Sequence, residues 1–589
     1  MKGPSQTNQR IGMQAHQRQK QQRLLHETSV STTDVVIIGA GASGLQCSYL
    51  LRKAGYSVTL LEARPRVGGR IDSVVHRVKN IYTGNYVSCV VDHGAAWVHG
   101  LGFEWPTSWT GTQPASVPTA NPMLDLMDAP NELRPVFVRG NPWRRPKECT
   151  YKTNQLGLYR GGKALHKDTE GAAAVDKAFG TFFRVMARVS DYGNSLYNAG
   201  EGMETARQSL YGTFQRELSQ VVVEDENNDL DGLAQFFLYM IEVWYGTSSS
   251  GLQLSEFINE HDDGDGDDNN SNDNGSAGGD GARTIETVKD DSDYSPEGDF
   301  LGPHCAVRSG MAKLLEPLQG HGETIRLEEP VRRIIRMVND NTVLVETQTD
   351  SCLIRAHCCV VTMSVGCLQQ NHESMFSPPL DDAKVDAIGS LGMAKYKKVF
   401  MVFDDVFWDP DETFIGLVLD DTTNGNSNPL GRYLLLDNLW ASRGLACLEA
   451  ILVGEAADWA HDRLDMIVCY AVLDFMEETM GLTGTMNLRD RCVDFSITRW
   501  EEDPYSCGAY SNLRLGTTER QMEELQRPSW DGTLVFCGEH TCPDYEGSVH
   551  AALFSGQRAA KQVQDLLSKT TAAMMMKKKQ GMMGTKATR

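Results

Sequence analysis

The sequence lacks the long apolar run that a membrane-spanning helix needs. No stretch of its 589 residues reaches about 18 uninterrupted apolar positions. Residues 1–33 are rich in Gln, Arg and Lys without an apolar centre, which is not the pattern of a secretory signal. We therefore expect no membrane partner, a disordered tail over residues 1–33 and a basic, solvated tail over residues 569–589.

Cysteine patterns typical of zinc sites are also missing. The 14 cysteines are scattered, with no C-x-x-C pair. Cys358 and Cys359 lie inside an apolar stretch and Cys47 in an expected helix, so these thiols are expected to be buried and reduced. The sequence thus predicts no metal site and a reducing compartment. We expect the cytoplasm, and the three lysines at 577–579 leave the nucleus as the alternative.

An excess of positive charge is absent as well. The chain has 56 Lys and Arg against 78 Asp and Glu, a formal net charge of -22. This balance argues against nucleic acid as a partner and suits a small cationic substrate. Part of the acid is concentrated in residues 259–299, which are rich in Asp, Gly, Asn and Ser. Such a segment cannot bury enough apolar surface to fold, so we expect a disordered insertion.

The strongest positive pattern lies in residues 34–62. A short Val- and Ile-rich run, typical of a buried parallel strand, is followed by G-x-G-x-x-G at Gly39, Gly41 and Gly44 and then by an apolar-periodic helix. The first glycine permits a tight turn, the second lets a pyrophosphate approach the backbone, and the third lets helix and strand pack closely. The helix N-terminus would bind phosphate, and Glu62 would accept hydrogen bonds from a ribose. This pattern predicts dinucleotide binding.

A second loop, residues 63–71, carries Arg64, Arg66 and Arg70 around Gly69. Arginine forks bind phosphate oxygens bidentately. A simple nicotinamide dehydrogenase does not need this extension. The loop resembles the second phosphate-contacting loop of FAD-containing amine oxidases, which favours FAD over NAD.

Small residues at 94–96 suggest backbone lying against a flat ring system, with Trp97 and His99 pointing into the cavity beneath that ring. Core packing of Trp97, and an imidazole without a function at His99, remain the alternatives. The helix expected from near Ser548 would place its N-terminus where it stabilises negative charge on a reduced flavin.

Two lysines, Lys397 and Lys398, interrupt an apolar strand expected at Tyr396–Phe403. Neighbouring residues on a strand face opposite sides, so we expect one lysine to face solvent and the other the interior. A buried lysine is costly, which makes one of them a functional candidate. The other expected elements are strands at 58–61, 342–347, 358–362, 431–437 and 445–453 and helices within 170–245 and at 382–390 and 458–479. Residues 103–160 are expected to be rich in loops.

Taken together, the motifs resemble those of the flavin-dependent amine oxidases, which include polyamine oxidases, spermine oxidases and lysine-specific histone demethylases. The resemblance covers roughly residues 34–115 and 300–567. It is carried by GAGASG, LLEARPRVGGR, GAAWVHG, FSPPL, KKVFMVFDDVFW, TRWEEDPYSCGAYS and GEHTCPDYEGSVHAALFSGQRAA.

The resemblance implies an α/β fold in which a Rossmann-like FAD-binding domain of the GR2 type is interleaved with an α+β substrate domain that carries a mixed sheet. We accordingly expect FAD-binding parts at 34–115, 300–370 and 496–568, and substrate-domain parts at 116–258, mostly helical, and 371–495.

The resemblance also implies roles for single residues. Lys398 matches a lysine held near flavin N5 through a water, Trp500 a tryptophan beside the flavin, and His99 a histidine in the substrate tunnel. Tyr510 and Ser548 match the two walls that flank the substrate amine, although some relatives carry a second aromatic residue in place of Ser548. The positions that match FAD contacts are Gly39, Gly41, Ser43, Gly44, Glu62, Arg64, Gly69, Arg70, Ala95, Ala96, Val331, Trp500, Glu539, Ser548 and Val549. No cysteine matches a covalent flavin attachment, so the FAD is expected to be non-covalent.

The function implied is oxidation of a polyamine by hydride transfer to flavin, with O2 as the acceptor and aldehyde, a shorter amine and H2O2 as products. A histone-lysine demethylase is the first alternative, but the helical SWIRM domain and the coiled-coil insertion usual in those proteins do not appear. A non-catalytic FAD-binding scaffold is the second alternative, and the intact Lys398 argues against it.

Overall fold

The computed structural model describes residues 30–586 apart from 80–83, 85, 100–122, 124–125, 127–132, 137–155, 201–206, 225–230, 258–303, 308, 321–324, 350–352 and 421–427. The acidic insertion expected at 259–299 and most of the expected N-terminal tail lie outside the described residues.

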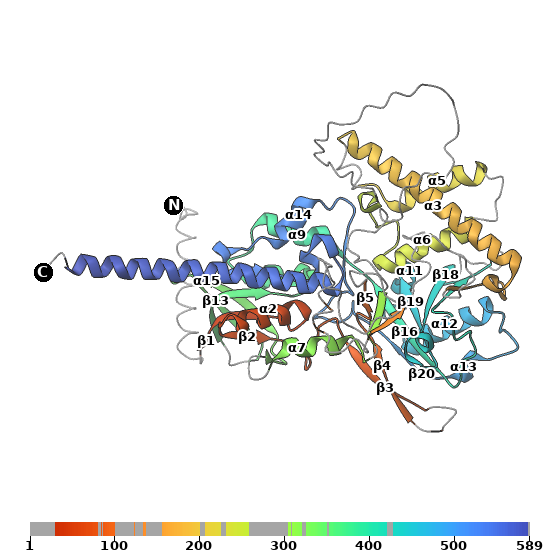
Figure 1. Cartoon of the computed structure of the whole chain (residues 1–589), viewed down its shortest axis with the longest axis horizontal. Helices are drawn as coiled ribbons and strands as arrows, with labels where there is room; N and C mark the ends of the chain where they lie inside the picture. The colour runs from red at the N-terminus through yellow and green to blue at the C-terminus, as the bar shows by residue number, and fades with distance from the viewer. Residues whose placement is uncertain are drawn as a thin grey trace, which may run out of the picture.

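A first, eight-stranded sheet forms the half of the molecule that carries the glycine motif (Figure 1). Its order is β10-β2-β1-β13-β12-β11-β14, and β22 pairs with β13. β1 runs parallel to β2 and β13, whereas β11, β12 and β13 are antiparallel. The strand bounds are Val30–Ile38 for β1, Val58–Leu61 for β2, Ile325–Arg326 for β10, Val331–Met337 for β11, Thr342–Thr347 for β12, Leu353–Val361 for β13, Phe376–Ser377 for β14 and Leu534–Phe536 for β22.

The end of β1 is buried on both sides, as its apolar run predicts. Val35 and Ile37 pack into one hydrophobic cluster, together with helix α2 (Ala42–Lys53) and the start of helix α15 (Val549–Lys586). Val36 and Ile38 pack into another cluster on the opposite face. This double burial fixes the loop after β1, where the glycine motif lies.

A second, seven-stranded sheet has the order β20-β16-β19-β18-β17-β7-β8. It is mixed, because β7 is parallel to β17 while the other pairs are antiparallel. Its strands are β7 (Leu156–Arg160), β8 (Lys163–Ala164), β16 (Tyr396–Phe403), β17 (Phe414–Val418), β18 (Tyr433–Asn438), β19 (Cys447–Val453) and β20 (Cys492–Ile497).

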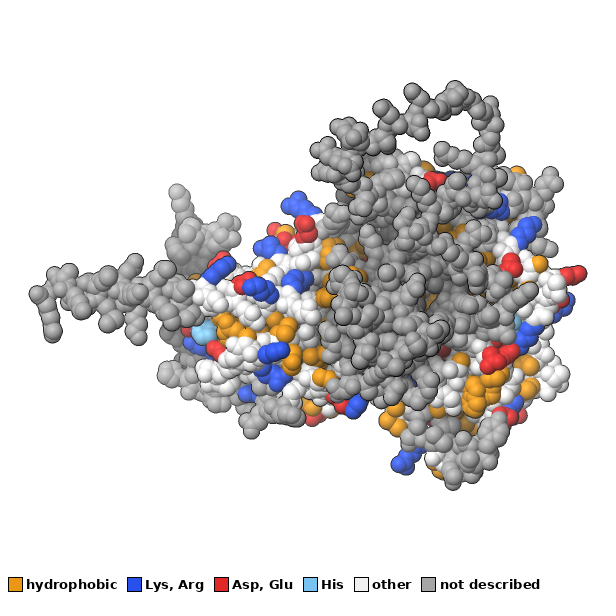
Figure 2. Space-filling model, viewed as in Figure 1, with side chains coloured by type: hydrophobic (Ala, Val, Ile, Leu, Met, Phe, Trp, Pro, Cys, Tyr) orange, Lys and Arg blue, Asp and Glu red, His pale blue; other side chains and the backbone are white. Residues whose placement is uncertain are grey.

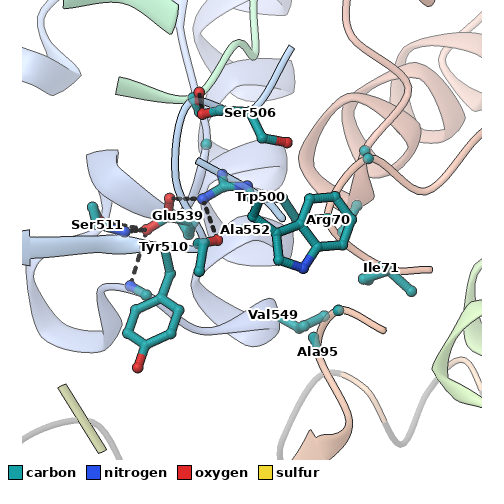
Figure 3. Close-up of a pocket in the computed structure, with 18 of the residues that line it drawn as sticks. Arg70, Ile71, Ala95, Trp500, Ser506, Tyr510, Ser511, Glu539, Val549 and Ala552 are labelled. Atoms are coloured by element: carbon teal, nitrogen blue, oxygen red, sulfur yellow. Dashed lines mark hydrogen bonds and ion pairs between the residues drawn. The ribbon is translucent and has the colours of Figure 1, made fainter. Parts of the chain in front are cut away.

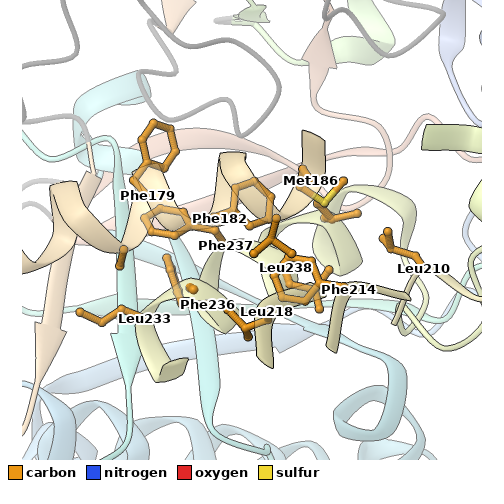
Figure 4. Packing of buried hydrophobic residues seen from close by; sticks show 14 of the residues in the cluster. Phe179, Phe182, Met186, Leu210, Phe214, Leu218, Leu233, Phe236, Phe237 and Leu238 are labelled. Carbon is orange, nitrogen blue, oxygen red and sulfur yellow. The ribbon is translucent and has the colours of Figure 1, made fainter. Parts of the chain in front are cut away.

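Helices cover both faces of the second sheet. One face packs against α12 (Asp465–Thr479), where Val399 and Met401 of β16 join its apolar side chains. Over the other face lie α3 (Thr169–Asn198), α5 (Leu210–Glu224) and α6 (Asp231–Tyr245), whose Phe and Leu side chains interlock (Figure 4).

The remaining elements are short. The strand pairs and triplet are β3 (Ser73–Lys79) with β4 (Tyr86–Asp92), β15 (Leu391–Met393) with β21 (Ser511–Leu513), and β9 (His304–Val307) between β5 (Trp97–Val98) and β6 (Leu133–Val136). The other α-helices are α7 (Glu316–Gln319), α8 (Val365–Met375), α9 (Asp382–Ser390), α10 (Leu439–Arg443), α11 (Gly454–Ala460), α13 (Leu488–Arg491) and α14 (Glu519–Gln526).

Several expectations about elements need correction. The helix expected at 458–479 is two helices, α11 and α12, because Asp462 between them has a left-handed φ of 58°. Strand β7 lies in a region expected to be loops, and its pairing partner, β17, lies some 250 residues later in the chain. The C-terminal tail expected from 569 is helical as far as Lys586, since α15 continues to that residue. β20 crosses the expected boundary at 495 and belongs to the second sheet.

Within the described part of the chain, no helix combines the length and the apolar character needed to cross a bilayer. On the face shown in Figure 2, the described Lys and Arg side chains are interspersed with Asp and Glu over both halves of the molecule. That distribution differs from the continuous basic stripe of a nucleic-acid-binding face.

The helical core predicts a measurable loss of stability. Phe237 is fully buried and contacts Phe179, Phe182 and Phe236 at ring-centroid distances of 4.9, 5.9 and 5.7 Å. Phe237→Ala should lower the free energy of unfolding by about 3–5 kcal/mol, because it leaves a cavity among these rings. Urea denaturation measures the change. Tyr197→Ala, at a side chain that is 58% exposed, serves as the control and should change it by less than about 0.5 kcal/mol.

Candidate active site

One cavity of about 750 Å³ joins the two sheets. Its walls come from the ends of β1 and β2, the start of α2, strands β16, β18 and β19, the end of α6 and the start of α15. The residues predicted above to contact FAD or substrate line this cavity, with the exceptions of Gly44 and Arg66.

The glycine loop is shaped by close backbone contacts. Gly39 has φ +103°, and a Cβ on it would lie 2.4 Å from Thr362 Oγ1. A Cβ on Gly44 would lie 2.0 Å from the Gly39 carbonyl oxygen, so Gly44 lets α2 pack against the loop, as predicted, and does not line the cavity. The Gly69 backbone packs against Gly41, and a Cβ there would meet Gly41 Cα at 3.4 Å. The loop therefore leaves bare backbone facing the cavity, which fits a pyrophosphate.

Glu62 lies at the end of β2 and is 3% exposed. Its two carboxylate oxygens accept hydrogen bonds from the backbone N–H groups of Ala40, at 2.8 Å, and Arg64, at 2.9 Å. Each oxygen keeps a second lone pair. The carboxylate is thus held rigidly at the cavity wall with capacity left for ribose hydroxyls.

The arginines of the second loop differ in direction. Arg64 donates to Asp503 Oδ2 at 2.7 Å and to Ser506 Oγ at 2.8 Å, and it lines the cavity. Arg66 turns away, pairs with Asp72 at 3.1 Å and does not line the cavity. Only two of the three arginines expected at the pyrophosphate are therefore available there.

Arg70 is the third arginine, and it pairs with Glu539 at 2.7 Å (Figure 3). Burial raises the pKa of Glu539, but Arg70, His540 and the Ser511 hydroxyl more than offset this, so the pKa lies below its usual value. Glu539 is consequently an anion, and it holds the Arg70 side chain against the segment between β22 and α15.

Residues 94–96 form the small-residue segment predicted to lie along a flat ring. A Cβ on Gly94 would lie 1.8 Å from the Arg70 carbonyl oxygen, and Ala95 N–H donates to that oxygen at 3.2 Å. Trp500 is fixed beside this segment because its Nε1–H donates to the His93 carbonyl at 3.0 Å. Ala95, Ala96 and Trp500 thus make one continuous surface of the cavity.

Two serines that line the cavity, Ser43 and Ser548, hold the starts of helices α2 and α15 in place. The Ser43 and Ser555 hydroxyls lie 3.0 Å apart, which joins α2 to α15. Ser548 Oγ accepts from Ala551 N–H at 3.1 Å and donates to the Tyr545 carbonyl at 2.7 Å, so it caps α15. Val549, the first residue of α15, lines the cavity, as does Val331 at the start of β11.

Lys398 is the buried lysine that faces the cavity. Its ammonium donates to the Asp92 carbonyl oxygen at 3.0 Å and pairs with Glu449 at 3.2 Å. The lysine side chain is 7% exposed. Sequence reasoning did not identify either partner, because both come from strands far from Lys398 in the chain.

The expectation that the other lysine faces solvent is wrong. Lys397 is fully buried, pairs with Glu501 and lies 3.6 Å from Glu502. Burial lowers its pKa to about 8, although Glu502 opposes the shift. The reason for the error is that α12 covers the second face of the sheet, which leaves neither side of β16 open to water.

Aromatic residues close the cavity near Lys398. The Tyr510 hydroxyl donates to the Trp244 carbonyl at 2.8 Å, and Tyr396 lies 5.8 Å from Tyr510 between ring centroids. His99 contacts the Trp244 ring at 5.0 Å, and burial lowers its pKa to about 4, so the imidazole is neutral near pH 7. Tyr396 and Trp244 were not predicted. The signal for Tyr396 was its position two residues before Lys398, on the same face of β16.

Comparison with known proteins supports a flavin-binding fold. A model of the family "Flavin containing amine oxidoreductase" matches residues 289–564, and one of an NAD(P)-binding Rossmann-like domain matches residues 37–107. A redesigned putrescine oxidase of known structure superposes with a TM-score of 0.57 at 16% identity, covering 91% of this chain and 100% of that one, which supports the fold.

Two of the similar proteins have names that indicate different activities. "Lysine-specific histone demethylase 1 homolog 3" of Arabidopsis thaliana is 26% identical over 555 residues, which are 90% of this chain and 30% of that protein. "Polyamine oxidase 5" of Oryza sativa subsp. japonica is 25% identical over 551 residues, 92% of this chain and 89% of that protein. This chain therefore spans less than a third of the first relative and most of the second. Over residues 289–564 the chain is similar to the flavin-containing amine oxidoreductases, and FAD is the cofactor that this similarity and the Rossmann-like match at residues 37–107 support.

Proposed function

We propose that the protein is a polyamine oxidase that cleaves a secondary-amine C–N bond of spermine, spermidine or their acetylated forms. The observation that carries this proposal is the aromatic end of the cavity, where the paired rings of Tyr396 and Tyr510 line the same cavity as Lys398. The rice polyamine oxidase that aligns over 89% of its length supports the same substrate class. We further propose that FAD is bound non-covalently, because neither Cys537 nor Cys542 lines the cavity.

The reaction consumes one amine, one O2 and one water and yields an aldehyde, a shorter amine and H2O2. Bound FAD supplies the acceptor for the hydride that leaves the α-carbon of the amine. The protein has to bind the amine in its neutral form, since the nitrogen lone pair assists departure of the hydride.

Apolar walls favour the neutral amine. This end of the cavity is lined by aromatic and aliphatic side chains, namely Tyr396, Tyr510, Phe414, Leu435 and Ile451. Taking an ammonium out of water into such surroundings lowers its pKa. The hydrogen bond from Tyr510 to the Trp244 carbonyl fixes the ring, so that the wall keeps its shape when substrate enters.

Lys398 and the N-terminus of α15 both place positive charge at the cavity. A lysine ammonium has three donors, and the two contacts to Asp92 and Glu449 leave one for a water in the cavity. We assign Lys398 and that water to imine hydrolysis or to the reaction with O2. The N-terminus of α15 adds partial positive charge where Ser548 and Val549 border the cavity. The net charge of -22 favours the approach of a cationic polyamine.

A histone-lysine demethylase activity is the second candidate. Ser548, a small residue that lines the cavity, matches a position where some relatives have an aromatic side chain, and a wider site accommodates a peptidyl lysine. The alignment with the Arabidopsis demethylase homologue over 90% of this chain supports this candidate.

A substrate panel separates the candidates. Purified protein should be yellow and should release H2O2 with spermine, spermidine or an acetylated polyamine, and product mass identifies the bond that is cleaved. Formaldehyde from a methylated histone H3 peptide, with no H2O2 from any polyamine, would establish the second candidate. A yellow protein that is inert to every amine would show a non-catalytic scaffold.

Lys398→Met should slow turnover about 100-fold or more while FAD stays bound, because it removes the ammonium donor assigned to the water in the cavity. Stopped-flow kinetics and flavin absorbance measure the two quantities. Lys395→Met is the matched control, since Lys395 is 54% exposed and pairs with Asp458 at the surface. Equal turnover in both variants would remove the role assigned to Lys398.

Tyr396→Leu should raise KM for the polyamine about 5- to 10-fold, because it deletes one of the two rings that pack at the aromatic end. Tyr396→Phe keeps the ring and should behave as the wild type. Steady-state kinetics at fixed O2 provide the comparison. An unchanged KM in the leucine variant would place the substrate elsewhere in the cavity.

A further inference from the structure

Behind Lys398, the second sheet buries more charge than an isolated lysine requires. Five charged side chains, here termed the buried charge cluster, come together from five elements: Asp92 of β4, Lys398 of β16, Asp437 of β18, Arg443 of α10 and Glu449 of β19. Asp92, Asp437, Glu449 and Lys398 are between 2% and 6% exposed. The Arg443 side chain is 5% exposed.

Strand register places the two carboxylates of the sheet side by side. Asp437 on β18 and Glu449 on β19 are direct Cα partners of an antiparallel pair. Their side chains consequently leave the same face at neighbouring positions. Phe400 is the partner of Glu449 on β16, and Lys398 lies two residues before it on the same face. This is the face that lines the main cavity.

Four of the five charges form two ion pairs. Arg443 pairs with Asp92 at 2.5 Å and donates to the Val90 carbonyl at 2.6 Å. Glu449 pairs with Lys398 at 3.2 Å. Asp437 is the remaining group. Its Oδ1 is buried without a hydrogen-bond partner among the described residues.

The cluster therefore holds three carboxylates against two cations. Two carboxylates that adjoin in a dry site cannot both ionise at low cost. Burial, followed by the charge of Glu449, raises the pKa of Asp437 to about 8, against the weaker opposing effect of Lys398 and Arg443. Burial also raises the pKa of Glu449, although Lys398 opposes this. One proton accordingly stays on the pair at neutral pH.

A small chamber lies next to the pair. Its volume of about 10 Å³ is close to the space that one water needs. The chamber contains three buried polar atoms without a hydrogen-bond partner in the described part of the chain, namely Asp437 Oδ1, Ser442 Oγ and Arg443 Nε. Ala96 and Trp97 line both this chamber and the main cavity.

We propose that Asp437 and Glu449 share one proton and exchange it with the main cavity through Lys398, so that the pair is an internal proton store for the reaction. This inference rests on the proposed oxidase function. Reduction of O2 to H2O2 takes one proton for each hydride removed from the amine. Lys398 donates that proton to the cavity and regains one from Glu449. The pair is refilled when a substrate ammonium loses its proton on the way to the reactive, neutral amine.

Asp437 is a positioning residue in this scheme, since it acts through Glu449 and Lys398 and touches neither substrate nor cofactor. The charged groups that face it are Glu449, Lys398 and Arg443, with Asp92 behind the arginine. Any titration of Asp437 therefore reports all of these groups together.

The test uses the full-length, FAD-loaded protein and its variants Asp437→Asn and Glu449→Gln. The first measurement is infrared spectroscopy across pH without substrate. The wild type should show a protonated carboxylic acid band that disappears near pH 8, and Asp437→Asn should lack that band. Glu412→Gln is the matched control, because Glu412 is a fully buried carboxylate next to the same sheet that contacts His166 instead of Lys398. The control should keep the band.

The second measurement is reoxidation by O2 after chemical reduction of the flavin with dithionite, which needs no amine. The wild-type rate should fall as pH rises through about 8, while Asp437→Asn should be about 10-fold slower below pH 8 and independent of pH across that range. Glu449→Gln should show the same loss. A protein that oxidises no polyamine but behaves in this way would overturn the proposed substrate and leave the proton store standing.

Stability gives an independent readout. The folded pKa of Asp437 lies above its unfolded value, so the stabilisation it provides is complete below the unfolded pKa and is lost as pH rises through about 8. Between about pH 5 and pH 8, the melting temperature of the wild type should therefore fall more steeply than the melting temperature of Asp437→Asn. Retention of the infrared band, the reoxidation profile and the melting profile in both variants would disprove the proton store.

Discussion

The ion pair between Lys398 and Glu449 is the interaction on which the site depends. It joins two strands of the second sheet, β16 and β19. The same ammonium donates to the carbonyl of Asp92, which ends the β3–β4 hairpin just before the small residues at 94–96. Without these partners, the desolvation cost would either keep the lysine side chain from being buried or lower its pKa until it lost its charge. Because the pair and the carbonyl satisfy its hydrogen-bonding groups, the ammonium stays charged at the wall of the main cavity.

The parts of the fold that follow from local pattern could be predicted from sequence. Strands β2, β12 and β16 and helix α9 have the bounds expected for them, since each is a short apolar run or a capped helix with clear neighbours. Gly39 and Gly44 make the close contacts that their spacing predicts. In such cases the residues that decide the structure are adjacent in the chain.

What could not be predicted depends on residues that are distant in the chain. Alternation along β16 indicated that one lysine faces outward, but α12 covers that side and Glu501 neutralises Lys397. Arg66 belongs to a cationic loop by sequence, yet Asp72 draws it away from the cavity. Asp437 could not be predicted as a site residue because no motif surrounds it in the sequence. Only the register between β18 and β19 brings it next to Glu449.

The buried charge cluster also changes how any pH dependence of this protein should be interpreted. His99 has a pKa of about 4, and the pKa of Tyr510 is raised far above neutrality by burial, so neither titrates between pH 6 and 9, a span of about 3 units. Within that span the charge changes in the coupled carboxylates behind Lys398 and also at Cys367, which lines the cavity and whose pKa is lowered to about 7, chiefly by its hydrogen bond with Cys507. An apparent pKa in kinetic data then belongs to the cluster and the substrate amine as one system. An acid buried beside a second carboxylate costs stability once both are ionised, and the position of Asp437 behind Lys398 places its titration next to the main cavity.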